Sequence, residues 1–506
     1  MVKPDTPTQP SGTPIPAETD EPPPTSQRRC AAIILAAGQG TRMRSNLSKM
    51  LHPVAGRPMI DAVLAAASGA APTQTLFVVN RGNAAQLRDY AAPRYADLTF
   101  VIQEEQLGTG HAPAVALPLV ESTVEDVIIL FGDHPLDTPE MVAATLAEHR
   151  ASGALVTMAA CRHPTGGQHG RISRDTRGRI VRITEWRDVR DEEPGPKEIN
   201  SGIHCFRRAW LAEQLPLLPR QPNGEYYLTD LIAVAASGAT HGMADGAPWP
   251  VAAVTVDLDA AMGVNDRTHL AEATRLARLR INERHMLAGV TLGDPASTFI
   301  DHDVTIGRDT VIHPGCILTG RTAIGADCTI GPGARIRDSV IGDGASVIDS
   351  TVEEATVGPG TDIGPYSHLR PGARLAGGVH IGNFVEIKNS TIGSGTAIGH
   401  VSYLGDATLG EGVNIGAGVI TANYDGTTKH RTTIGAGAFI GVDTILRAPV
   451  EIGAGAVTGG GSFVNRDVPA GQKVVGIPAR PIPQHARDAA RPAPPEPPNR
   501  DSTSED

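Results

Sequence analysis

The apolar positions of this chain follow two different patterns. In the first half, from residue 30 to about residue 264, short apolar runs alternate with helix-like segments, which is typical of βα units around a parallel sheet. The runs are residues 31–35, 76–79, 99–102 and 127–131. Residues 266–286 then carry apolar residues at helical spacing from Leu270 to Leu279. We predict a helix there whose apolar stripe serves packing.

From about Val304 onward, an aliphatic residue followed by a small one recurs about every six residues. The pairs include Ile306-Gly307, Ile324-Gly325, Ile330-Gly331, Ile363-Gly364, Ile381-Gly382, Ile398-Gly399, Ile415-Gly416, Ile434-Gly435, Ile440-Gly441 and Ile452-Gly453. Such a hexad predicts a β-helix in which aliphatic side chains point inward, small residues fit the corners and three hexads complete one triangular coil. Residues 421–433 break the period, which predicts a loop leaving the helix. A Gly-rich linker, the alternative, would not keep its aliphatic residues in phase.

Composition narrows the class of protein. The net charge of -11 and the aromatic content of 4% argue against a nucleic-acid partner, and no apolar run approaches the ~20 residues that span a bilayer. The five cysteines show no metal or disulfide spacing, and the first 28 residues contain no signal-peptide core. We therefore expect reduced thiols, a cytoplasmic location, and disorder in the Pro-rich residues 1–28 and 481–506.

A candidate phosphate-binding turn follows the first predicted strand. It reads Leu35-Ala36-Ala37-Gly38-Gln39-Gly40-Thr41-Arg42-Met43, and Lys49 follows. Backbone N–H groups in a Gly-rich turn can hold phosphate oxygens, and Arg42 and Lys49 add the cations needed where charge builds up on a transferring phosphoryl group. Alone, the turn could be an ordinary βα connection; the two cations favour phosphate binding.

This string resembles the sugar-nucleotide pyrophosphorylase signature L-x-x-G-x-G-T-R-M followed by Lys, although Ser48 stands where the family usually has Pro. The resemblance implies that Arg42 and Lys49 are catalytic. It implies UDP-sugar contacts at Leu35, Ala36, Ala37, Gly38, Lys49, Gln103, Gln106, Gly108, Thr109, Gly170, Glu185, Asn200 and Asn265. Of these, Gln106 and Thr109 are the expected base contacts, because an amide can both donate to and accept from a uracil edge. The loop 164–170 is about two residues longer than the family form.

Asp133 comes two residues after the apolar run 127–131, at the strand end where open α/β sheets bind ligands. A carboxylate there suits Mg2+, which prefers oxygen ligands, and Asn265 resembles the second metal ligand of the family. Asp133 could instead cap a helix that starts near Thr138. The resemblance implies Mg2+-dependent uridylyl transfer from UTP to a sugar 1-phosphate, with release of pyrophosphate.

The solenoid carries a second set of polar residues, in runs around Arg370, Lys388, His400, Asn414 and Asn423. These runs resemble the acetyltransferase half of the bacterial bifunctional enzymes that make UDP-N-acetylglucosamine, and the resemblance covers about residues 30–470. It implies a Rossmann-like uridylyltransferase domain (29–259), a linker helix (260–289), a left-handed parallel β-helix acetyltransferase domain (290–480) and a homotrimer.

The resemblance also implies roles within the β-helix. His400 is the expected proton acceptor, because imidazole can take a proton from a sugar amine near neutral pH. The implied glucosamine-phosphate contacts are Arg370, Lys388, Tyr403, Asn414 and Lys429, and the implied acetyl-CoA contacts are Ala417, Asn423, Tyr424, Val442, Gly460 and Arg480; Asn423 can also reach the sugar. Val442 and Gly460 stand where the family commonly has Ser and Ala, so we expect one hydroxyl contact to be lost.

The leading hypothesis is an enzyme that acetylates glucosamine 1-phosphate with acetyl-CoA and then uridylates the product with UTP and Mg2+, for cell-wall precursor synthesis. The alternative is a single-activity sugar-1-phosphate nucleotidyltransferase whose β-helix only trimerises the chain. A third possibility, a non-catalytic assembly protein on the same folds, predicts no metal-dependent turnover.

Overall fold

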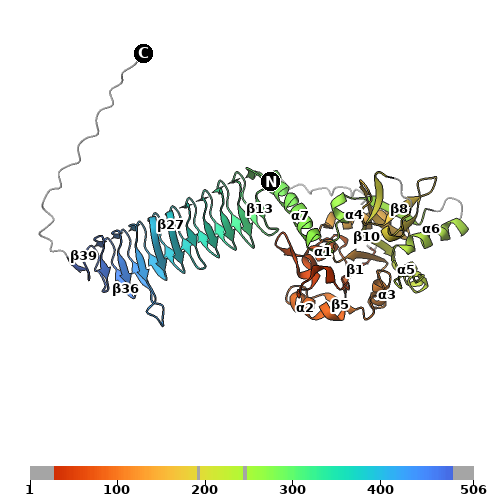
Figure 1. Cartoon of the computed structure of the whole chain (residues 1–506), viewed down its shortest axis with the longest axis horizontal. Coiled ribbons are helices and arrows are strands. Elements are labelled where there is room, and N and C mark those ends of the chain that lie inside the picture. Colours follow the sequence, from red (N-terminus) through yellow and green to blue (C-terminus); the bar gives the residue numbers. More distant parts are fainter. Residues whose placement is uncertain (1–27, 191–193, 243–247, 482–506) are drawn as a thin grey trace, which may run out of the picture. The chain divides into compact units, whose positions relative to one another are not determined.

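A computed structural model describes residues 28–190, 194–242 and 248–481, which form two compact units (Figure 1). The first, called the sheet unit, comprises residues 28–38, 66–131 and 138–256. The second, called the solenoid unit, comprises residues 39–65, 132–137 and 257–481. The disorder predicted for the two ends of the chain concerns residues that, apart from Arg28 and Pro481, lie outside the described ones.

A nine-stranded sheet forms the centre of the sheet unit, in the order β11-β7-β10-β6-β1-β4-β5, with β8 and β9 attached to β10. Four strands match the predicted apolar runs to within two residues at each end: β1 (Cys30–Leu35), β4 (Gln74–Val79), β5 (Leu98–Ile102) and β6 (Asp126–Phe131). These four pair in parallel, as predicted. The others are β7 (Val156–His163), β8 (Arg171–Arg174), β9 (Ile180–Thr184), β10 (Lys197–Arg207) and β11 (Val251–Thr255). β10 is antiparallel to β6 and β7, so the sheet is mixed.

Helices bury the sheet because its central strands are apolar on both faces. On one face, Ala31, Ile33, Leu76 and Val78 share a core with side chains of α3, α5 and α6. The helices of this unit are α2 (Arg81–Ala91), α3 (His111–Ala116), α4 (Pro139–Ser152), α5 (Arg208–Gln214) and α6 (Asp230–Gly242). α1 (Met59–Ala67) lies mostly in the segment 39–65 of the solenoid unit.

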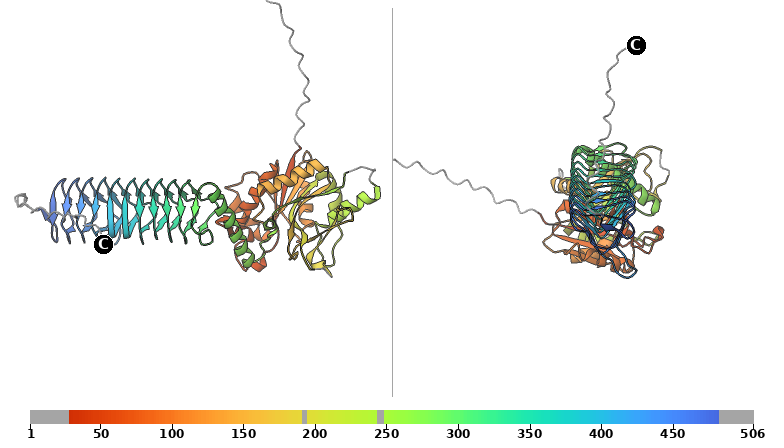
Figure 2. Two further views of the ribbon diagram at one scale, coloured as in Figure 1. Left: turned by 90° about the horizontal axis from the view of Figure 1, so that it is seen from above. Right: turned by 90° about the vertical axis from the view of Figure 1, so that its left-hand side faces the viewer.

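The solenoid unit is a stack of coils, each made of short parallel strands (Figure 2). One face is a nine-stranded sheet from β14 (Thr305–Ile306) to β36 (Val450–Ile452). Neighbouring residues on this face are mostly 16 to 18 apart in sequence, as at Thr305–Ala323, Val340–Thr356 and Thr391–Thr408. The other strands of the coils form one twenty-stranded sheet, since β27 (His380–Lys388) and β29 (Ala397–Gly405) each run through a corner. In the segment 39–65, β2 (Pro53–Val54) and β3 (Arg57–Pro58) pair with each other. The predicted β-helix of three hexads per coil is confirmed.

The aliphatic residue of each hexad supplies the solenoid core, as predicted. Ile381, Ile398 and Ile415 lie in register in successive coils and are buried. Each buried isoleucine contributes roughly 1.5 to 3 kcal/mol from the hydrophobic effect. The small residue is required as well, because a Cβ on Gly382 would collide with the Gly399 carbonyl.

The predicted break at 421–433 is a loop between β32 (Ile420–Ala422) and β33 (Thr432–Ile434). The step between paired residues rises there to 25, from Thr408 to Thr433. Hydrogen bonds order the loop: the Asp425 carboxylate accepts from the Thr428 N–H at 2.7 Å and pairs with His430 at 2.7 Å, while Tyr424 and Lys429 form a β-bridge.

The predicted helix at 266–286 is α7 (Arg267–Leu287). Asp266 is its N-cap, and the Asp266 carboxylate accepts hydrogen bonds from the Thr268 and His269 N–H groups. The packing role predicted for its apolar stripe is wrong at Leu279, which is 44% exposed. The prediction holds at Ala273, which is fully buried, and the helix also buries Ile281, Asn282 and His285. The Asn282 amide donates to the carbonyls of Pro295 and Thr298.

The five cysteines are free and buried. Among the described helices, none is long and apolar enough to cross a bilayer.

Candidate active sites

Two asparagines hold the turn that follows β1. Asn80 lies at the N-terminus of α2, and its amide donates to the carbonyls of Ala37 at 2.9 Å and Gly38 at 3.3 Å. Asn83 donates to the Ala36 carbonyl at 3.0 Å and exchanges capping hydrogen bonds with Asn80. The turn is therefore fixed from one side by side-chain amides.

These hydrogen bonds fix the direction in which the backbone N–H groups of the turn point. In a planar trans peptide the N–H points opposite to the carbonyl, so the N–H groups of Ala37 and Gly38 point away from Asn80 and Asn83. Aligned N–H groups of this kind form an anion-binding cradle. The sequence argument missed Asn80, although its place directly after β4, at the carboxyl end of a parallel strand, was an available signal.

The predicted base-reading residues lie between β5 and α3. The Gln103 side chain is buried and its Nε2 lies 2.9 Å from His111 Nδ1, whereas Gln106 is exposed. The Thr109 hydroxyl accepts from the Leu228 N–H at 3.1 Å and keeps its own proton to donate. Gly108 has φ +95°, and a Cβ there would lie 2.7 Å from the Tyr226 carbonyl oxygen, so only glycine fits.

The three residues predicted to contact the sugar come together in the sheet unit. The Asn200 N–H donates to the Gly170 carbonyl at 3.0 Å, and a Cβ on Gly170 would lie 3.8 Å from Glu185 Oε1. Glu185 accepts a 2.7 Å hydrogen bond from Thr229. Burial, together with Asp230 and Asp188, raises the pKa of the Glu185 carboxyl.

The lengthened loop 164–170 is folded around one guanidinium group. Arg171 donates to the carbonyls of Gly166 at 2.8 Å and Gly167 at 3.0 Å, and also to that of His169. Gly166 and Gly167 both have positive φ. The loop thus has a defined shape next to Gly170.

A set of charged and amide groups meets in the solenoid unit, in its segments 39–65 and 132–137 and in residues 264–265, just before α7. Lys49 Nζ lies 2.7 Å from Asp133 Oδ2, and the Arg42 guanidinium donates to Asn265 Oδ1 at 2.9 Å. The Val264 N–H donates to the Asp133 carbonyl at 2.8 Å, which fixes Asn265 beside Asp133. The predicted catalytic cations thus contact the two predicted metal ligands.

Asp133 is ionised in this setting. Burial favours the neutral acid, but the charges of Lys49 and His134 and the Lys49 hydrogen bond outweigh it and lower the pKa of the Asp133 carboxyl. A carboxylate and an amide oxygen are ligands that Mg2+ accepts, provided waters or phosphates complete its shell. The alternative role for Asp133 as a helix cap is wrong, because Thr138 caps α4 by accepting from the Met141 N–H.

His400 occupies one corner of the β-helix. Ile398, Ile415, Ile440 and Thr458 pair in register in successive coils. The residues two positions later therefore form one column along that corner: His400, Ala417, Val442 and Gly460. At about 4.8 Å per strand spacing, His400 and Gly460 are roughly 14 Å apart. His400 Nδ1 lies 2.9 Å from Oδ1 of Asn383, its neighbour one coil earlier, which the sequence argument missed.

At the same corner, the residues that follow Pro365, Asn383 and His400 in three successive coils are bulky and have positive φ. They are Tyr366 (φ 61°), Phe384 (φ 58°) and Val401 (φ 34°). All three are exposed, and the rings of Tyr366 and Phe384 stack at 5.5 Å. Such backbone costs free energy and is concentrated at functional sites. Here it lies next to His400.

Three cations gather on the adjacent face. Arg370 follows β25 (His368–Leu369) and pairs with Glu386 at 2.6 Å. The charges of Lys429 and Arg370, with a Lys429 hydrogen bond, lower the pKa of Lys388. The loop at 423–431 thus brings Lys429 to the coil residues Arg370 and Lys388. Cations held this close favour an anion between them.

A neighbouring polar cluster contains Tyr403, Asn423 and Asp406. The Asn423 and Asn389 amides each donate to Asp406 at 2.5 Å. A Cβ on Gly405 would collide with the Tyr403 hydroxyl and lie 2.8 Å from the Asn423 amide nitrogen. Asp406 therefore positions a predicted site residue, Asn423, and was itself not predicted.

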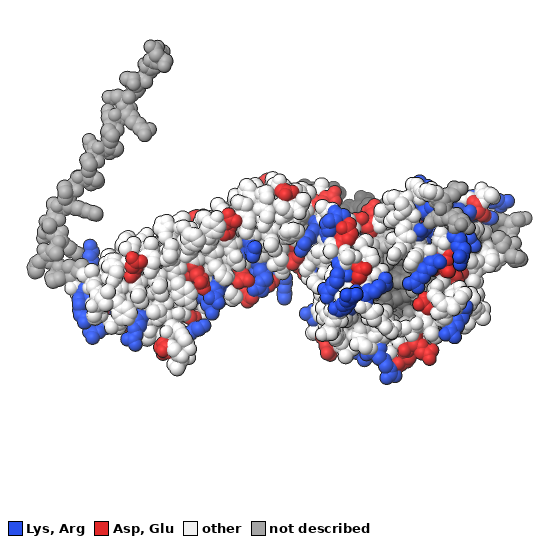
Figure 3. Space-filling view, viewed as in Figure 1, with Lys and Arg blue, Asp and Glu red and all other residues white. Residues whose placement is uncertain are grey.

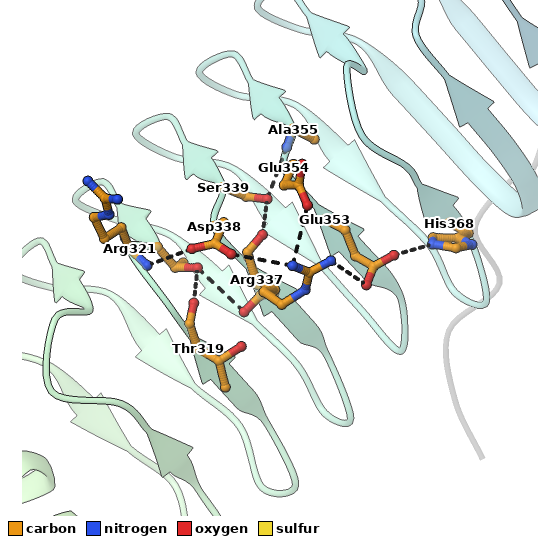
Figure 4. Close-up of polar contacts among 11 residues, drawn as sticks. Thr319, Arg321, Arg337, Asp338, Ser339, Glu353, Glu354, Ala355 and His368 are labelled. Carbon is orange, nitrogen blue, oxygen red and sulfur yellow. Dashed lines mark hydrogen bonds and ion pairs between the residues drawn. The ribbon is translucent and has the colours of Figure 1, made fainter. Parts of the chain in front are cut away.

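A different charge network lies earlier in the solenoid. Arg337, on β19 (Arg335–Arg337), lies 3.2 Å from Glu353, 3.3 Å from Glu354 and 3.4 Å from Asp338, and Glu353 also contacts His368 (Figure 4). Charges of both signs are likewise mixed over the visible face of the solenoid unit (Figure 3). Three acidic residues thus surround Arg337 in this network, whereas three cations gather around Lys388.

The predicted acetyl-CoA residues lie in the last coils and the loop. Val442 and Gly460 are neighbours in adjacent coils of the His400 column, and Tyr424 is exposed in the loop. Asn414, a predicted glucosamine-phosphate contact, begins β31 (Asn414–Ile415), in register with Ala397 and Phe439. Arg480 lies on β40 (Arg480–Pro481), exposed, and donates to the carbonyl of Ala479. The roles of these residues stay predictions.

The fold and these residues define a two-part transferase, a nucleotide-dependent α/β half followed by a hexapeptide-repeat half. Residues 32–217 match the family model of the MobA-like NTP transferase domain, and residues 303–338 match that of the bacterial transferase hexapeptide (six repeats). The chain is also similar to full-length curated proteins named bifunctional protein GlmU.

The GlmU protein of Pelobacter propionicus is 45% identical over 88% of this chain and 95% of its own length. That of Trichlorobacter lovleyi is 45% identical over 87% of this chain and 94% of its own, and that of Heliobacterium modesticaldum is 44% identical over 88% and 94%. The chain belongs to the GlmU family of bifunctional proteins. The predicted family and the two-domain transferase architecture are confirmed.

Proposed function

We propose that this chain acetylates glucosamine 1-phosphate with acetyl-CoA and transfers a uridylyl group from UTP to the N-acetylglucosamine 1-phosphate so formed. Residues 290–480 carry the first reaction and residues 29–259 the second, in a cytoplasmic homotrimer that supplies cell-wall precursors. Membership of a bifunctional family supports both activities, and hexapeptide repeats support an oligomer.

For uridylyl transfer, the sugar phosphate oxygen attacks the α-phosphorus of UTP in line and pyrophosphate leaves. Mg2+, held by Asp133 and Asn265, supplies positive charge to the phosphate oxygens when bound. Arg42 and Lys49 neutralise charge on the phosphates, and the N–H groups of Ala37 and Gly38 orient them. Gln103, Gln106, Gly108 and Thr109 bind the base, while Gly170, Glu185 and Asn200 bind the sugar.

For acetyl transfer, His400 removes a proton from the sugar ammonium or amine, so that the nitrogen attacks the thioester carbonyl; the C–S bond breaks and the CoA thiolate takes up a proton. Arg370, Lys388 and Lys429 bind the sugar phosphate, and Tyr403, Asn414 and Asn423 bind its hydroxyls. The acetyl-CoA contacts are Ala417, Asn423, Tyr424, Val442, Gly460 and Arg480.

One observation carries the acetyltransferase proposal against the scaffold alternative. A β-helix that only assembles subunits has no need of an imidazole held by Asn383 beside three clustered cations. The charges of Lys429 and Arg370 lower the pKa of Lys388, and an anion bound between these cations would offset their repulsion.

The test measures both reactions on one preparation. Glucosamine 1-phosphate with acetyl-CoA is followed by free CoA thiol, and UTP with N-acetylglucosamine 1-phosphate and Mg2+ by pyrophosphate. We expect His400→Ala to lose the first signal by at least ~100-fold and keep the second, and Asp133→Ala to do the reverse. The control variants His380→Ala and Asp303→Ala alter exposed side chains on the same solenoid unit.

The outcomes separate the alternatives. Pyrophosphate without CoA release from the unaltered chain would favour the single-activity enzyme with a scaffolding β-helix. Neither signal would favour a non-catalytic assembly protein. Loss of both activities in His400→Ala would mean that this variant fails to fold, which its thermal midpoint would show.

A further inference from the structure

His134 follows Asp133 directly, and its ring turns back toward the same carboxylate. His134 Nε2 lies 3.8 Å from Asp133 Oδ1, while the other carboxylate oxygen, Oδ2, contacts Lys49. Hydrogen bonds from nitrogen to oxygen have donor–acceptor distances of about 2.7 to 3.2 Å, so a gap separates His134 Nε2 from Asp133 Oδ1. The two atoms are close neighbours, but they are too far apart to share a hydrogen bond.

The other ring nitrogen of His134 is held by the backbone. Nδ1 lies 3.3 Å from the carbonyl oxygen of Ala260, at the end of the short helix η7 (Leu258–Ala261). A carbonyl oxygen only accepts, so Nδ1 carries the proton of the neutral ring and Nε2 keeps its lone pair. Histidines that bind metals commonly donate their second ring N–H to a backbone carbonyl, which fixes the tautomer and the ring orientation. The His134 ring is therefore oriented as a metal ligand would be.

The segment before Asn265 leaves room at this nitrogen. A Cβ built on Gly263 would lie 3.1 Å from His134 Nε2 and 3.9 Å from the Asn265 amide nitrogen. The Val264 N–H donates to the Asp133 carbonyl, which ties this segment to the Asp133 backbone. A side chain at position 263 would thus press on His134 Nε2, whereas glycine leaves space beside it, between Asp133 and Asn265.

The separation of 3.8 Å between His134 Nε2 and Asp133 Oδ1 suits two ligands of one metal ion. Small divalent ions lie about 2.0 to 2.2 Å from nitrogen and oxygen ligands, so two ligands of one ion are at most about 4.4 Å apart. Imidazole suits the later first-row metals, whereas Mg2+ prefers oxygen ligands.

We propose that His134 Nε2 is a nitrogen ligand of the divalent ion held by Asp133 and Asn265, and that it shifts the preference of this site from Mg2+ toward a transition-metal ion such as Co2+. The proposal rests on the metal site of the proposed uridylyl transfer. It concerns which ion the site prefers, whereas the proposed function requires only that a divalent ion binds there.

The test is electron paramagnetic resonance on the full chain with Mn2+ as the added metal. We expect the bound Mn2+ to show spin-echo modulation from a directly coordinated imidazole nitrogen, and this signal to be lost in His134→Val and in His134→Gln. Displacement of Mn2+ by Co2+ or by Mg2+ then gives the Kd of each ion. His134→Val should weaken Co2+ binding about 10- to 100-fold and change Mg2+ binding less than about 3-fold.

The matched control is His380→Val, because His380 is an exposed histidine that also lies beside a carboxylate, 2.6 Å from Asp362. This variant should keep both the nitrogen signal and the Kd values. Thermal midpoints show whether each variant folds, and the signal of the unaltered chain tests the proposal even if one of them does not.

A nitrogen signal that persists in the His134 variants, or bound Mn2+ without such a signal in the unaltered chain, would overturn the proposal. Equal weakening of Co2+ and Mg2+ binding, or a chain that binds no Mn2+, would do the same. Pyrophosphate release with Mg2+, measured on the same preparation, keeps the proposed function separate. Release without a nitrogen signal would mean that only the role of His134 fails, and a signal without release would mean that only the proposed function fails.

Discussion

The two units place their candidate site residues by different means. In the sheet unit these residues lie on separate turns and loops, and each is held by its own contact, such as Asn80 under the turn after β1 or Arg171 within the loop 164–170. Within the coils of the β-helix, register brings most of them together, because residues 17 apart, such as Asn383 and His400, become neighbours. A repeat thus converts sequence spacing directly into geometry.

The largest effect that tests this comparison concerns the cation cluster. Lys388→Ala removes a charge that the register places beside Arg370, and a charge-assisted hydrogen bond is worth about 1.5 to 3 kcal/mol. We expect KM for glucosamine 1-phosphate to rise roughly 10- to 100-fold, with a smaller change in kcat and none in pyrophosphate release. Arg374→Ala, an exposed cation on another face of the coil, is the control. Equal effects of the two variants would contradict a localised phosphate site.

The corresponding change in the sheet unit is Asn80→Ala. It removes the two hydrogen bonds to the Ala37 and Gly38 carbonyls, the first of which orients the Gly38 N–H, and each is worth about 1 kcal/mol. We expect kcat/KM for UTP to fall about 5- to 30-fold while acetyl transfer is unchanged. Asn83→Ala, which loses one such bond, should show a smaller loss. Unchanged UTP kinetics would mean that the turn keeps its shape without Asn80.

The same contrast explains what could be predicted from the sequence. The β-helix, its break at 421–433 and four parallel strands followed from apolar spacing, because burial selects for that spacing. Asn80 was missed because its partners, Ala37 and Gly38, lie far along the chain and outside any repeat. Asn383 and Asp406 were missed although their partners lie 17 residues away, a spacing that the repeat makes neighbours. The packing predicted for the apolar stripe of α7 was wrong at Leu279, which is exposed. The face that packs there contains Asn282, whose hydrogen bonds to two carbonyls the spacing of apolar residues does not reveal. The sequence indicates that the loop 164–170 is longer than the family form, but its shape depends on the hydrogen bonds that Arg171 donates to the carbonyls of the loop.

A pH effect tests how closely the loop residue Lys429 approaches the coil. Lys429 and Arg370 lower the pKa of Lys388, so Lys388 loses its proton at a lower pH than an ordinary lysine and phosphate binding weakens with rising pH from there. Lys429→Met removes the positive charge that contributes most to the lowered pKa of Lys388. The pKa of Lys388 should then rise, and the increase of KM for glucosamine 1-phosphate at alkaline pH should begin at a higher pH. Profiles between pH 7 and 10 measure this. A profile that keeps its position would place Lys429 out of reach of Lys388.

The smallest effect concerns two aspartates of the segment 132–137. Asp133 contacts Lys49, whereas neither carboxyl oxygen of Asp137 has a hydrogen-bond partner among the described residues. Burial raises the pKa of Asp137 well above its usual value, and Arg280 only partly opposes this. A raised pKa means that the folded chain holds this proton more tightly than the unfolded chain. The contribution to stability is therefore present at acid pH and lost as pH rises through the raised pKa.

Replacing Asp137 by leucine removes this pH-dependent loss together with an unsatisfied buried group, a cost of about 1 to 3 kcal/mol. Calorimetric scans should therefore show a higher midpoint for Asp137→Leu, by roughly 2 to 4 °C per kcal/mol, with a larger difference at pH 8 than at pH 5. Asp303→Leu, at an exposed position, should show no such trend. If Asp137→Leu had a lower midpoint than the unaltered chain at pH 8, the Asp137 carboxylate would have a stabilising partner in the folded chain. Asp133 and Asp137 would then differ in their partners rather than in their charge.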